Sequence, residues 1–228
     1  MHRLLRILST ALITAGIVLL ADIGITLVYE EPLSSIYASV QQNKAEDELD
    51  ETEASYPSRA DERAVARIRN RKLKIATLAQ RFGAKAEAGE AIGRLRAPTM
   101  GDLDVVVVQG TDTASLQKGP GHFPETPFPG QGGTVGIAGH RTTYGAPFND
   151  AESVERGDRM VLEMPYAKIF YRVQKTEIVD PTDVGVVDYF GYERLVLSTC
   201  HPLYSAAQRL IVFARAVGER LRRGSPAS

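Results

Sequence analysis

The feature that most constrains the fold is a series of short apolar runs that begins near Gly89. Glycine, proline and aspartate interrupt the runs, with turn signals such as "RGDR" and "DPTD" between them. Short apolar runs punctuated in this way are typical of strands in an all-β barrel or sandwich. The candidate strands are "AIGRLRA", "DVVVVQG", "TVGIAGH", "RMVLEMP", "KIFYRVQKTEIV", "RLVLSTC" and "RLIVFARAV". The sequence therefore predicts an all-β domain, with short helices at "TASLQKG" and "FNDAESVER".

Size and charge restrict what this domain can do. A chain of 228 residues with 43% hydrophobic residues can bury one good core and still carry appendages. Its 27 basic and 28 acidic residues give a formal net charge of -1. Nucleic-acid binding usually needs clustered lysine and arginine on a basic domain, so we expect no nucleic-acid partner.

The first 31 residues predict a membrane anchor. Residues 7–29 are apolar across 23 positions, apart from a few Ser and Thr and from Asp22. As a helix this run spans ~34 Å, against a hydrocarbon core of ~30 Å. A cleaved signal peptide is the alternative, but its apolar region usually has about 7 to 15 residues and a small-residue cleavage site follows it. No such A-x-A site follows this run, so the sequence favours an uncleaved anchor.

The charges that flank the apolar run predict its orientation. Arg3 and Arg6 precede the run, and Glu30 and Glu31 follow it. Under the positive-inside rule, basic residues stay on the cytoplasmic side. We therefore expect a single-pass protein of the cell membrane, with a cytoplasmic N-terminus and an extracellular domain.

A stalk is predicted over residues 32–84. The stretch "KAEDELDETEASYPS" is acidic and poor in large apolar side chains, which predicts a solvated linker. After it, Ser58 and Asp61 have the spacing of a capping box, and the helix that they start is expected to end at Gly83. The barrel domain is expected over residues 85–218, followed by a flexible tail over residues 219–228.

Cys200 is the single cysteine of the chain, so it forms no internal disulfide. It can be a buried packing residue, a metal ligand or a nucleophile. His201 is adjacent, but the remaining histidines, His2, His122 and His140, show no metal-ligand spacing relative to it. We therefore expect no metal site and no cofactor.

The nucleophile interpretation rests on three strand ends. His140 ends the candidate strand "TVGIAGH", Cys200 ends "RLVLSTC", and Arg209 opens "RLIVFARAV". If the last two strands are antiparallel neighbours joined by "HPLYSAAQ", Cys200 and Arg209 lie close together. Neighbouring positive charge favours the reactive thiolate, and an arginine can donate to a developing oxyanion. These are the residue types that acyl transfer requires.

The segments "GIAGHRTTYGAPF" and "LVLSTCHPLYSAAQRLIVF" resemble those of sortases, the membrane-anchored cysteine transpeptidases of Gram-positive bacteria, and most of all those of class E. The resemblance covers about residues 85–218 and includes "KGPGHFP" and "VDPTDV". The family's TLxTC signature is present as "VLSTC", with Val196 in place of a threonine.

The resemblance implies an eight-stranded sortase-like β-barrel that performs thiol peptidase-type chemistry. Cys200 would be the nucleophile, His140 the general acid and base, and Arg209 the donor to the carbonyl or oxyanion. Sortases cleave a sorting motif of the LPxTG type between Thr and Gly, and class E favours LAxTG. The partners implied are secreted proteins with a C-terminal sorting signal and an amine acceptor on lipid II or a pilin. An extracellular domain on a Gram-positive type of membrane can reach both the secreted proteins and the amine acceptor.

Three further residues are candidates for substrate binding. Tyr144 follows the base and Thr199 precedes the nucleophile, so each can line the groove or serve only in packing and hydrogen bonding. His122 lies in the Pro-Gly-rich stretch from Gly119 to Gly133, a long loop expected at the barrel surface. It can line the groove or be a solvated loop histidine.

Other charged and basic residues are assigned no catalytic role. Successive strand residues point to opposite faces, so His201 is expected to point away from the site of Cys200 and not to be the base. Arg141 and Arg215 are interpreted as surface charges.

Two other function classes compete with this interpretation. An L,D-transpeptidase would carry its cysteine in an SxGCxR setting, but Pro202 occupies the position of the arginine. A non-enzymatic, membrane-tethered β-barrel binding module would use Cys200 only for packing. Fast alkylation of the thiol by iodoacetamide favours an enzyme, whereas an inert thiol favours the module.

Overall fold

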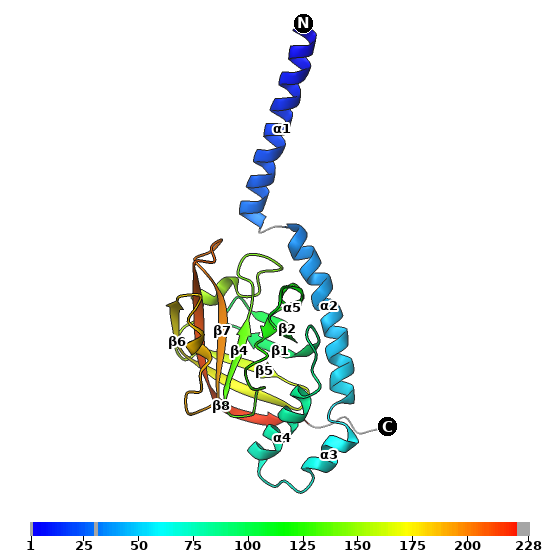
Figure 1. Cartoon of the computed structure of the whole chain (residues 1–228), viewed down its shortest axis with the longest axis vertical. Helices are drawn as coiled ribbons and strands as arrows, with labels where there is room; N and C mark the ends of the chain where they lie inside the picture. The colour runs from blue at the N-terminus through cyan, green and yellow to red at the C-terminus, as the bar shows by residue number, and fades with distance from the viewer. Residues whose placement is uncertain (1, 30–31, 223–228) are drawn as a thin grey trace.

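The predicted all-β barrel is confirmed by a computed structural model that describes residues 2–29 and 32–222 (Figure 1). In this described part, eight strands form a closed barrel in the order β1-β2-β3-β4-β7-β8-β6-β5. The strands are β1 (Ala91–Ala97), β2 (Leu103–Gln109), β3 (Gly121–His122), β4 (Thr134–Ala138), β5 (Arg159–Glu163), β6 (Ala167–Val179), β7 (Arg194–His201) and β8 (Gln208–Leu221).

Strand β3 is the one strand of the described barrel that the sequence pattern missed. Its two residues lie inside the Pro-Gly-rich stretch that was expected to be a surface loop. Gly121 and His122 pair with the end of β2 on one side and with β4 on the other. A two-residue strand has no alternation of its own, so only its neighbours define it.

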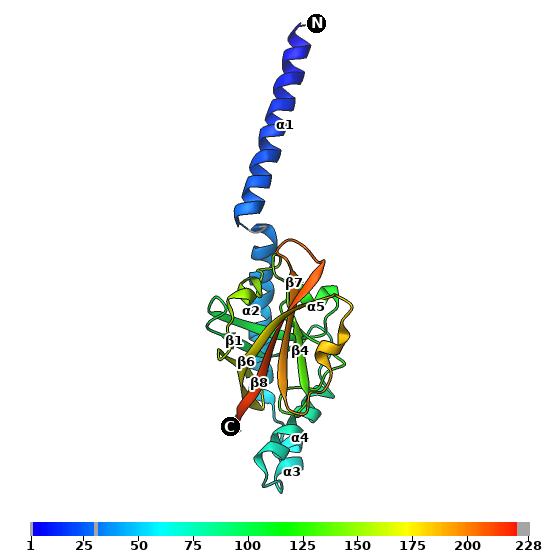
Figure 2. The same cartoon turned by 90° about the vertical axis from the view of Figure 1, so that its left-hand side faces the viewer.

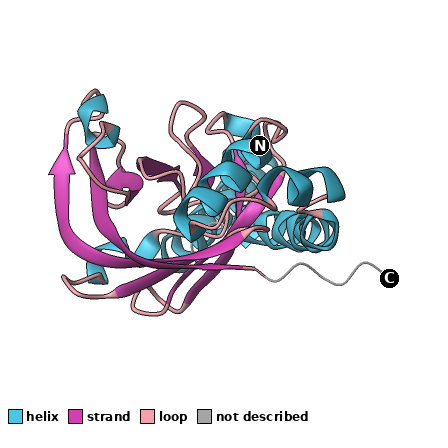
Figure 3. Cartoon of the chain, turned by 90° about the horizontal axis from the view of Figure 1, so that it is seen from below, coloured by secondary structure: helices cyan, strands magenta, loops and turns pink. Residues whose placement is uncertain are grey.

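The expected short helices are present around the barrel. Helix α5 (Thr113–Leu116) and the 3-10 helix η1 (Asn149–Ser153) lie in "TASLQKG" and "FNDAESVER". A second 3-10 helix, η2 (Val184–Val187), lies in the connection between β6 and β7, where no helix was predicted. Viewed from below, the long strands curve along one side and the longer helices lie toward the opposite side (Figure 3).

The core fills the barrel and continues below it. Leu95, Ile137 and Leu197 point into the interior and are at most 1% exposed. At the lower end, the ring of Phe82 from helix α4 (Arg71–Gly83) contacts the rings of Phe128 and Tyr166, with centroids 5.8 and 5.7 Å apart. The helix therefore closes the barrel at the end away from α1 (Figure 1).

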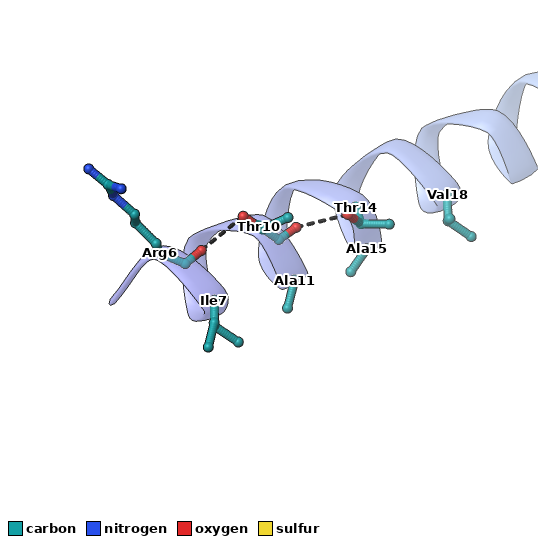
Figure 4. Close-up of a pocket in the computed structure, with 7 residues that line it drawn as sticks. All are labelled: Arg6, Ile7, Thr10, Ala11, Thr14, Ala15 and Val18. Atoms are coloured by element: carbon teal, nitrogen blue, oxygen red, sulfur yellow. Dashed lines mark hydrogen bonds between the residues drawn. The ribbon is translucent and has the colours of Figure 1, made fainter. Parts of the chain in front are cut away.

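Helix α1 (His2–Tyr29) stands clear of the barrel (Figures 1 and 2). Its large apolar side chains are exposed, for example Ile7 at 69% and Leu20 at 70%. The hydroxyls of Thr10 and Thr14 donate to carbonyl oxygens one turn earlier, each at 2.9 Å. A shallow hollow along this helix is lined by Arg6, Ile7, Thr10, Ala11, Thr14, Ala15 and Val18 (Figure 4).

None of the helices within residues 2–29 and 32–222 has the length and apolarity needed to cross a membrane. The anchor predicted over residues 7–29 is thus not confirmed. Residues 30 and 31 and the side chain of Asp22, which entered that prediction, lie outside the described residues.

The solvated linker predicted over residues 44–58 is wrong. Helix α2 (Pro32–Ser55) runs through most of this stretch and lies along the barrel wall (Figure 1). Ala45 and Leu49 are 4% and 2% exposed, and they form a buried cluster with residues of β1 and β2, namely Ala91 and Val106. These two apolar residues, one helical turn apart, share the face of the acidic helix that docks on the barrel.

Polar side chains of α2 also bind the barrel. The side-chain amide of Gln42 donates to the carbonyl oxygens of Val106 and Lys118 at 3.1 and 2.8 Å, and its oxygen accepts from the Val106 N–H at 2.8 Å. Glu46 pairs with Arg94, and Glu53 pairs with Arg222. The acidic composition that predicted solvation instead supplies partners for barrel groups.

The capping box at Ser58 and Asp61 is confirmed, but the single helix expected after it is wrong. Helix α3 (Arg59–Val65) is short, and α4 begins separately, with the Asn70 side chain accepting from the Leu73 N–H at 3.1 Å. Asn70 is a good N-cap residue, and this local signal explains the break.

At the other end of the chain, β8 continues to Leu221 and enters the predicted tail, because it pairs with β6 as far as Ala167. The remaining tail residues, 223–228, lie outside the described part.

Candidate active site

The structure brings the ends of β4, β7 and the start of β8 together. Strands β7 and β8 are antiparallel neighbours, and Cys200 lies directly opposite Arg209. Strands β4 and β7 are parallel, with Ala138 opposite Ser198, and the Gly139 N–H extends the ladder by donating to the Ser198 carbonyl at 3.0 Å. This register brings His140 level with Cys200. The expected proximity of Cys200 and Arg209 is present.

These three residues share one face of the sheet. Alternation along β7 and β8 places Cys200 on the side of Val196, and Arg209 on the side of Ile211 and Phe213. Those three apolar residues form a buried cluster, and Val186 and Val187 of η2 pack against it. The candidate catalytic residues therefore lie where an apolar outer face of the barrel opens at the end of its strands.

The environment of His140 favours its neutral form. The side chain is half-buried, and this burial lowers the pKa of its imidazole below the ordinary value. A neutral imidazole can accept a proton from a neighbouring thiol. Cys200 is partly exposed and free. The arrangement suits a nucleophile with an adjacent base.

Arg209 also contacts the connection between β7 and β8. Its Nη1 donates to the carbonyl oxygens of Ala206 and Gln208, each at 3.0 Å. The guanidinium is thus held at the strand end beside Cys200. Its role as a donor to substrate stays a prediction.

Tyr144 connects His140 to helix α2. Its ring lies 5.0 Å from the imidazole, centroid to centroid, and its hydroxyl accepts from the Gln117 amide at 3.0 Å. On the other side it meets the edge of the Tyr37 ring, with centroids 6.3 Å apart, and its N–H donates to the Ser34 hydroxyl at 3.3 Å. Tyr144 therefore contributes to the burial of the base. Its contact with substrate stays a prediction.

For Thr199, the structure favours hydrogen bonding over groove lining. The residue is 3% exposed, and its hydroxyl donates to the Gly139 carbonyl oxygen at 2.8 Å. Alternation turns it away from the face of Cys200. Its side chain supports the backbone just before His140.

The expected surface location of His122 is wrong. The residue is 1% exposed, and its Nδ1 lies 2.9 Å from Oε1 of Gln109, its cross-strand neighbour on β2. Its Nε2 lies 3.2 Å from the Thr126 hydroxyl. Burial lowers the pKa of His122 to about 4, opposed by the hydrogen bond to the Pro127 carbonyl. Pairing of β3 on both sides carries this histidine into the barrel wall.

The surface assignment of Arg141 is also wrong, whereas that of Arg215 is confirmed. Arg141 is 2% exposed, and its Nη1 donates to the Cys200 carbonyl oxygen at 3.2 Å. Arg215 is exposed, with its guanidinium 4.3 Å from the centroid of the Tyr192 ring. Alternation from His140 puts Arg141 on the face of His201, but this pattern does not indicate that the side chain is buried there.

No group of three or more His, Cys, Asp or Glu side chains within the described part is placed to hold a metal ion. The chemistry available at the three strand ends is that of a cysteine nucleophile beside an imidazole and a guanidinium, which defines a thiol-dependent acyl-transfer class of site. The family model of the sortase domain matches residues 95–217. The chain belongs to the sortase family of cysteine transpeptidases.

Among curated relatives, sortase D of Bacillus subtilis is 33% identical over 137 residues, which cover 58% of this chain and 67% of that protein. Sortase SrtE1 of Streptomyces coelicolor is 31% identical over 157 residues, covering 61% of this chain and 44% of that protein. The match thus spans less than half the length of SrtE1.

Solved structures agree with this family. Sortase E of Streptomyces avermitilis is 33% identical with a TM-score of 0.54, covering 59% of this chain and 93% of that structure. The SrtF sortase of Corynebacterium diphtheriae is 27% identical with a TM-score of 0.58, covering 63% and 93%. Both class D and class E sortases are therefore similar to this chain.

Proposed function

We propose that this chain is a sortase of class E type that cleaves an LPxTG or LAxTG sorting motif between Thr and Gly and transfers the acyl group to an amine of lipid II or a pilin. The observation that carries the proposal is the register at the strand ends. It sets Cys200 opposite Arg209 and level with His140, on one face. The solved SrtE1 of Streptomyces coelicolor, 30% identical with a TM-score of 0.56, is described with a tripeptide in its active site.

The chemistry follows from the three side chains. The Cys200 sulfur attacks the carbonyl carbon of the substrate threonine, and the His140 imidazole takes the thiol proton. Arg209 donates to the oxyanion that develops. His140 then gives the proton to the departing glycine amine, leaving a thioester. An acceptor amine attacks the thioester, its proton returns through His140 to sulfur, and a new amide bond forms while the thiol is restored.

The lowered pKa of His140 supports its part in the first step. Since burial disfavours the imidazolium form, the neutral base is present at neutral pH. The proton it accepts is held only until the leaving amine takes it. A base with this property passes protons in both directions during one cycle.

We further propose that residues 7–29 anchor the protein in the cell membrane with the catalytic domain outside. The open apolar side chains of α1 and the basic residues Arg3 and Arg6 support this location. The connection between β7 and β8 lies at the barrel end nearest α1 in Figures 1 and 2. An anchor at α1 would therefore direct the candidate site toward the membrane surface, where lipid-linked acceptors are.

The proposal is tested with a fluorogenic LAxTG-type peptide and hydroxylamine as the acceptor amine. The wild-type chain should release the glycine-containing fragment and form the peptide hydroxamate, and Cys200→Ala should do neither. Replacing the CH2–SH side chain by a methyl group costs little packing but removes the nucleophile. A Cys200→Ala chain that turns over peptide at a rate near wild type would refute the proposed function. An LPxTG peptide in parallel distinguishes the two motifs.

A further inference from the structure

The buried guanidinium of Arg141 joins three segments around the candidate site. Its Nη1 donates to the Cys200 carbonyl oxygen at 3.2 Å and lies 3.1 Å from Nδ1 of His201. Its Nη2 pairs with the Glu152 carboxylate at 2.9 Å, and the same carboxylate oxygen lies 3.1 Å from Nδ1 of His201. Nδ1 of His201 can donate to Glu152 or accept from Arg141, so either tautomer is bonded.

The contact with Cys200 continues the hydrogen-bond ladder between the two strands that carry base and nucleophile. At the end of the parallel pair of β4 and β7, the Gly139 N–H donates to the Ser198 carbonyl. Ladder bonds of parallel strands are evenly spaced, and the next carbonyl of β7 on this edge is that of Cys200. The side chain of Arg141 donates to that oxygen. Its guanidinium therefore fixes the end of β7 against the segment that holds His140.

The backbone at His140 and Arg141 is also fixed by hydrogen bonds. Its carbonyl oxygen accepts from the Asn149 side-chain amide at 3.1 Å, and the neighbouring His140 carbonyl accepts from the Phe148 N–H at 3.0 Å. These bonds close the base of the loop that follows His140. They also set η1 so that Glu152 reaches the guanidinium.

Arg141 acts from the far side of the sheet. It follows His140 directly, so alternation turns it to the face of His201 and away from the thiol of Cys200. With a side chain only 1% exposed, it does not reach a bound peptide. We propose that Arg141, with Glu152 as its counter-ion, is a positioning residue that sets Cys200 relative to His140 for acyl transfer. This inference rests on the proposed function.

The geometry explains why an arginine is needed. One planar fork serves the Cys200 carbonyl and the Glu152 carboxylate with different nitrogens, which a lysine ammonium does not reproduce. A displacement of ~1 Å between reacting groups can lower a rate about 100-fold. Arg141→Lys keeps the positive charge and loses the planar set of N–H donors. It therefore separates the effect of positioning from the effect of charge.

The first experiment measures kcat and KM of the full chain with the LAxTG-type peptide. Arg141→Lys should lower kcat at least tenfold and leave KM within threefold, and Glu152→Gln should lower kcat at least threefold. Matched controls are Arg156→Lys and Glu155→Gln, which make the same changes at exposed positions just after η1 and should stay within twofold of wild type. A kcat within threefold of wild type for Arg141→Lys would overturn the inference, and so would a loss confined to KM.

The second experiment does not depend on turnover. Amide hydrogen exchange in peptides that span residues 139–148 and 198–203 should be at least tenfold faster in Arg141→Lys than in Arg156→Lys. Unchanged exchange would show that Arg141 does not hold the strand ends together. If the wild-type chain cleaves no peptide, the proposed function fails, while this measurement still tests the positioning. If Arg141→Lys does not fold, Glu152→Gln decides by the same two measurements.

Discussion

Acidification should destabilise the barrel through one buried histidine. His122 is 1% exposed, and burial lowers its pKa from 6.5 to about 4. Between these values the unfolded chain binds a proton at this residue and the folded chain does not, so stability falls as pH falls. The difference of about 2.5 pKa units, at 1.36 kcal/mol each, amounts to about 3 kcal/mol. A typical domain has about 5 to 15 kcal/mol in total, so the effect is large.

Equilibrium urea unfolding at several pH values between 7 and 4 measures this effect. The reference is His122→Asn, which does not titrate in this range but keeps a polar side chain opposite Gln109. The variant should be less stable at neutral pH, because it loses part of the contact with Thr126. Its stability should nevertheless fall by about 3 kcal/mol less than that of the wild type on going to pH 4.

Comparing the wild type with His122→Asn removes the contribution of every other titrating group to the pH dependence, since both chains carry those groups. Two curves that run parallel from pH 7 to pH 4, separated by a constant amount, would refute the reasoning. That result would mean that the folded protein protonates His122 as readily as the unfolded chain does.

The remaining predictions concern the candidate catalytic residues. Arg209→Ala should lower kcat about 100-fold or more and change the free energy of unfolding by less than about 1 kcal/mol. Arg209→Lys should restore little of the lost single-turnover acylation rate. An acylation rate of Arg209→Lys within threefold of wild type would show that charge alone suffices. His140→Ala should be nearly inactive, whereas His201→Ala should keep its peptide cleavage rate within tenfold of wild type; the reverse would move the base to His201. Tyr144→Ala should expose the imidazole of His140 and raise its pKa, so the acidic limb of the pH profile of kcat should shift to higher pH. Tyr144→Phe should leave this acidic limb in place, although it loses the hydrogen bond to Gln117.

Local patterns predicted most of the barrel. The alternation of apolar residues and the turn residues between the runs located every strand except β3. The same pattern put His140, Cys200 and Arg209 at strand ends. Once β7 and β8 were assumed to be neighbours, the antiparallel register followed, because a short connection between two strands leaves few alternatives.

Composition was a poor guide where a segment is stabilised by contacts with distant parts of the chain. The acidic stretch of α2 was predicted to be solvated, yet Ala45 and Leu49 are buried against the barrel and Glu46 pairs with Arg94. Charge and low hydrophobicity describe a segment alone. They do not indicate whether a complementary surface for that segment lies elsewhere in the chain.

The sequence by itself determined the strands and the strand-end positions of the candidate catalytic residues, because alternation and turn chemistry depend on neighbours a few residues apart. Only the tertiary structure decided that Arg141 and His122 are buried. A charged or titratable side chain is buried when its polar groups are bonded there, and the partners of these two residues come from separate strands and from η1. Those partners meet only when the barrel closes, so no local pattern records them.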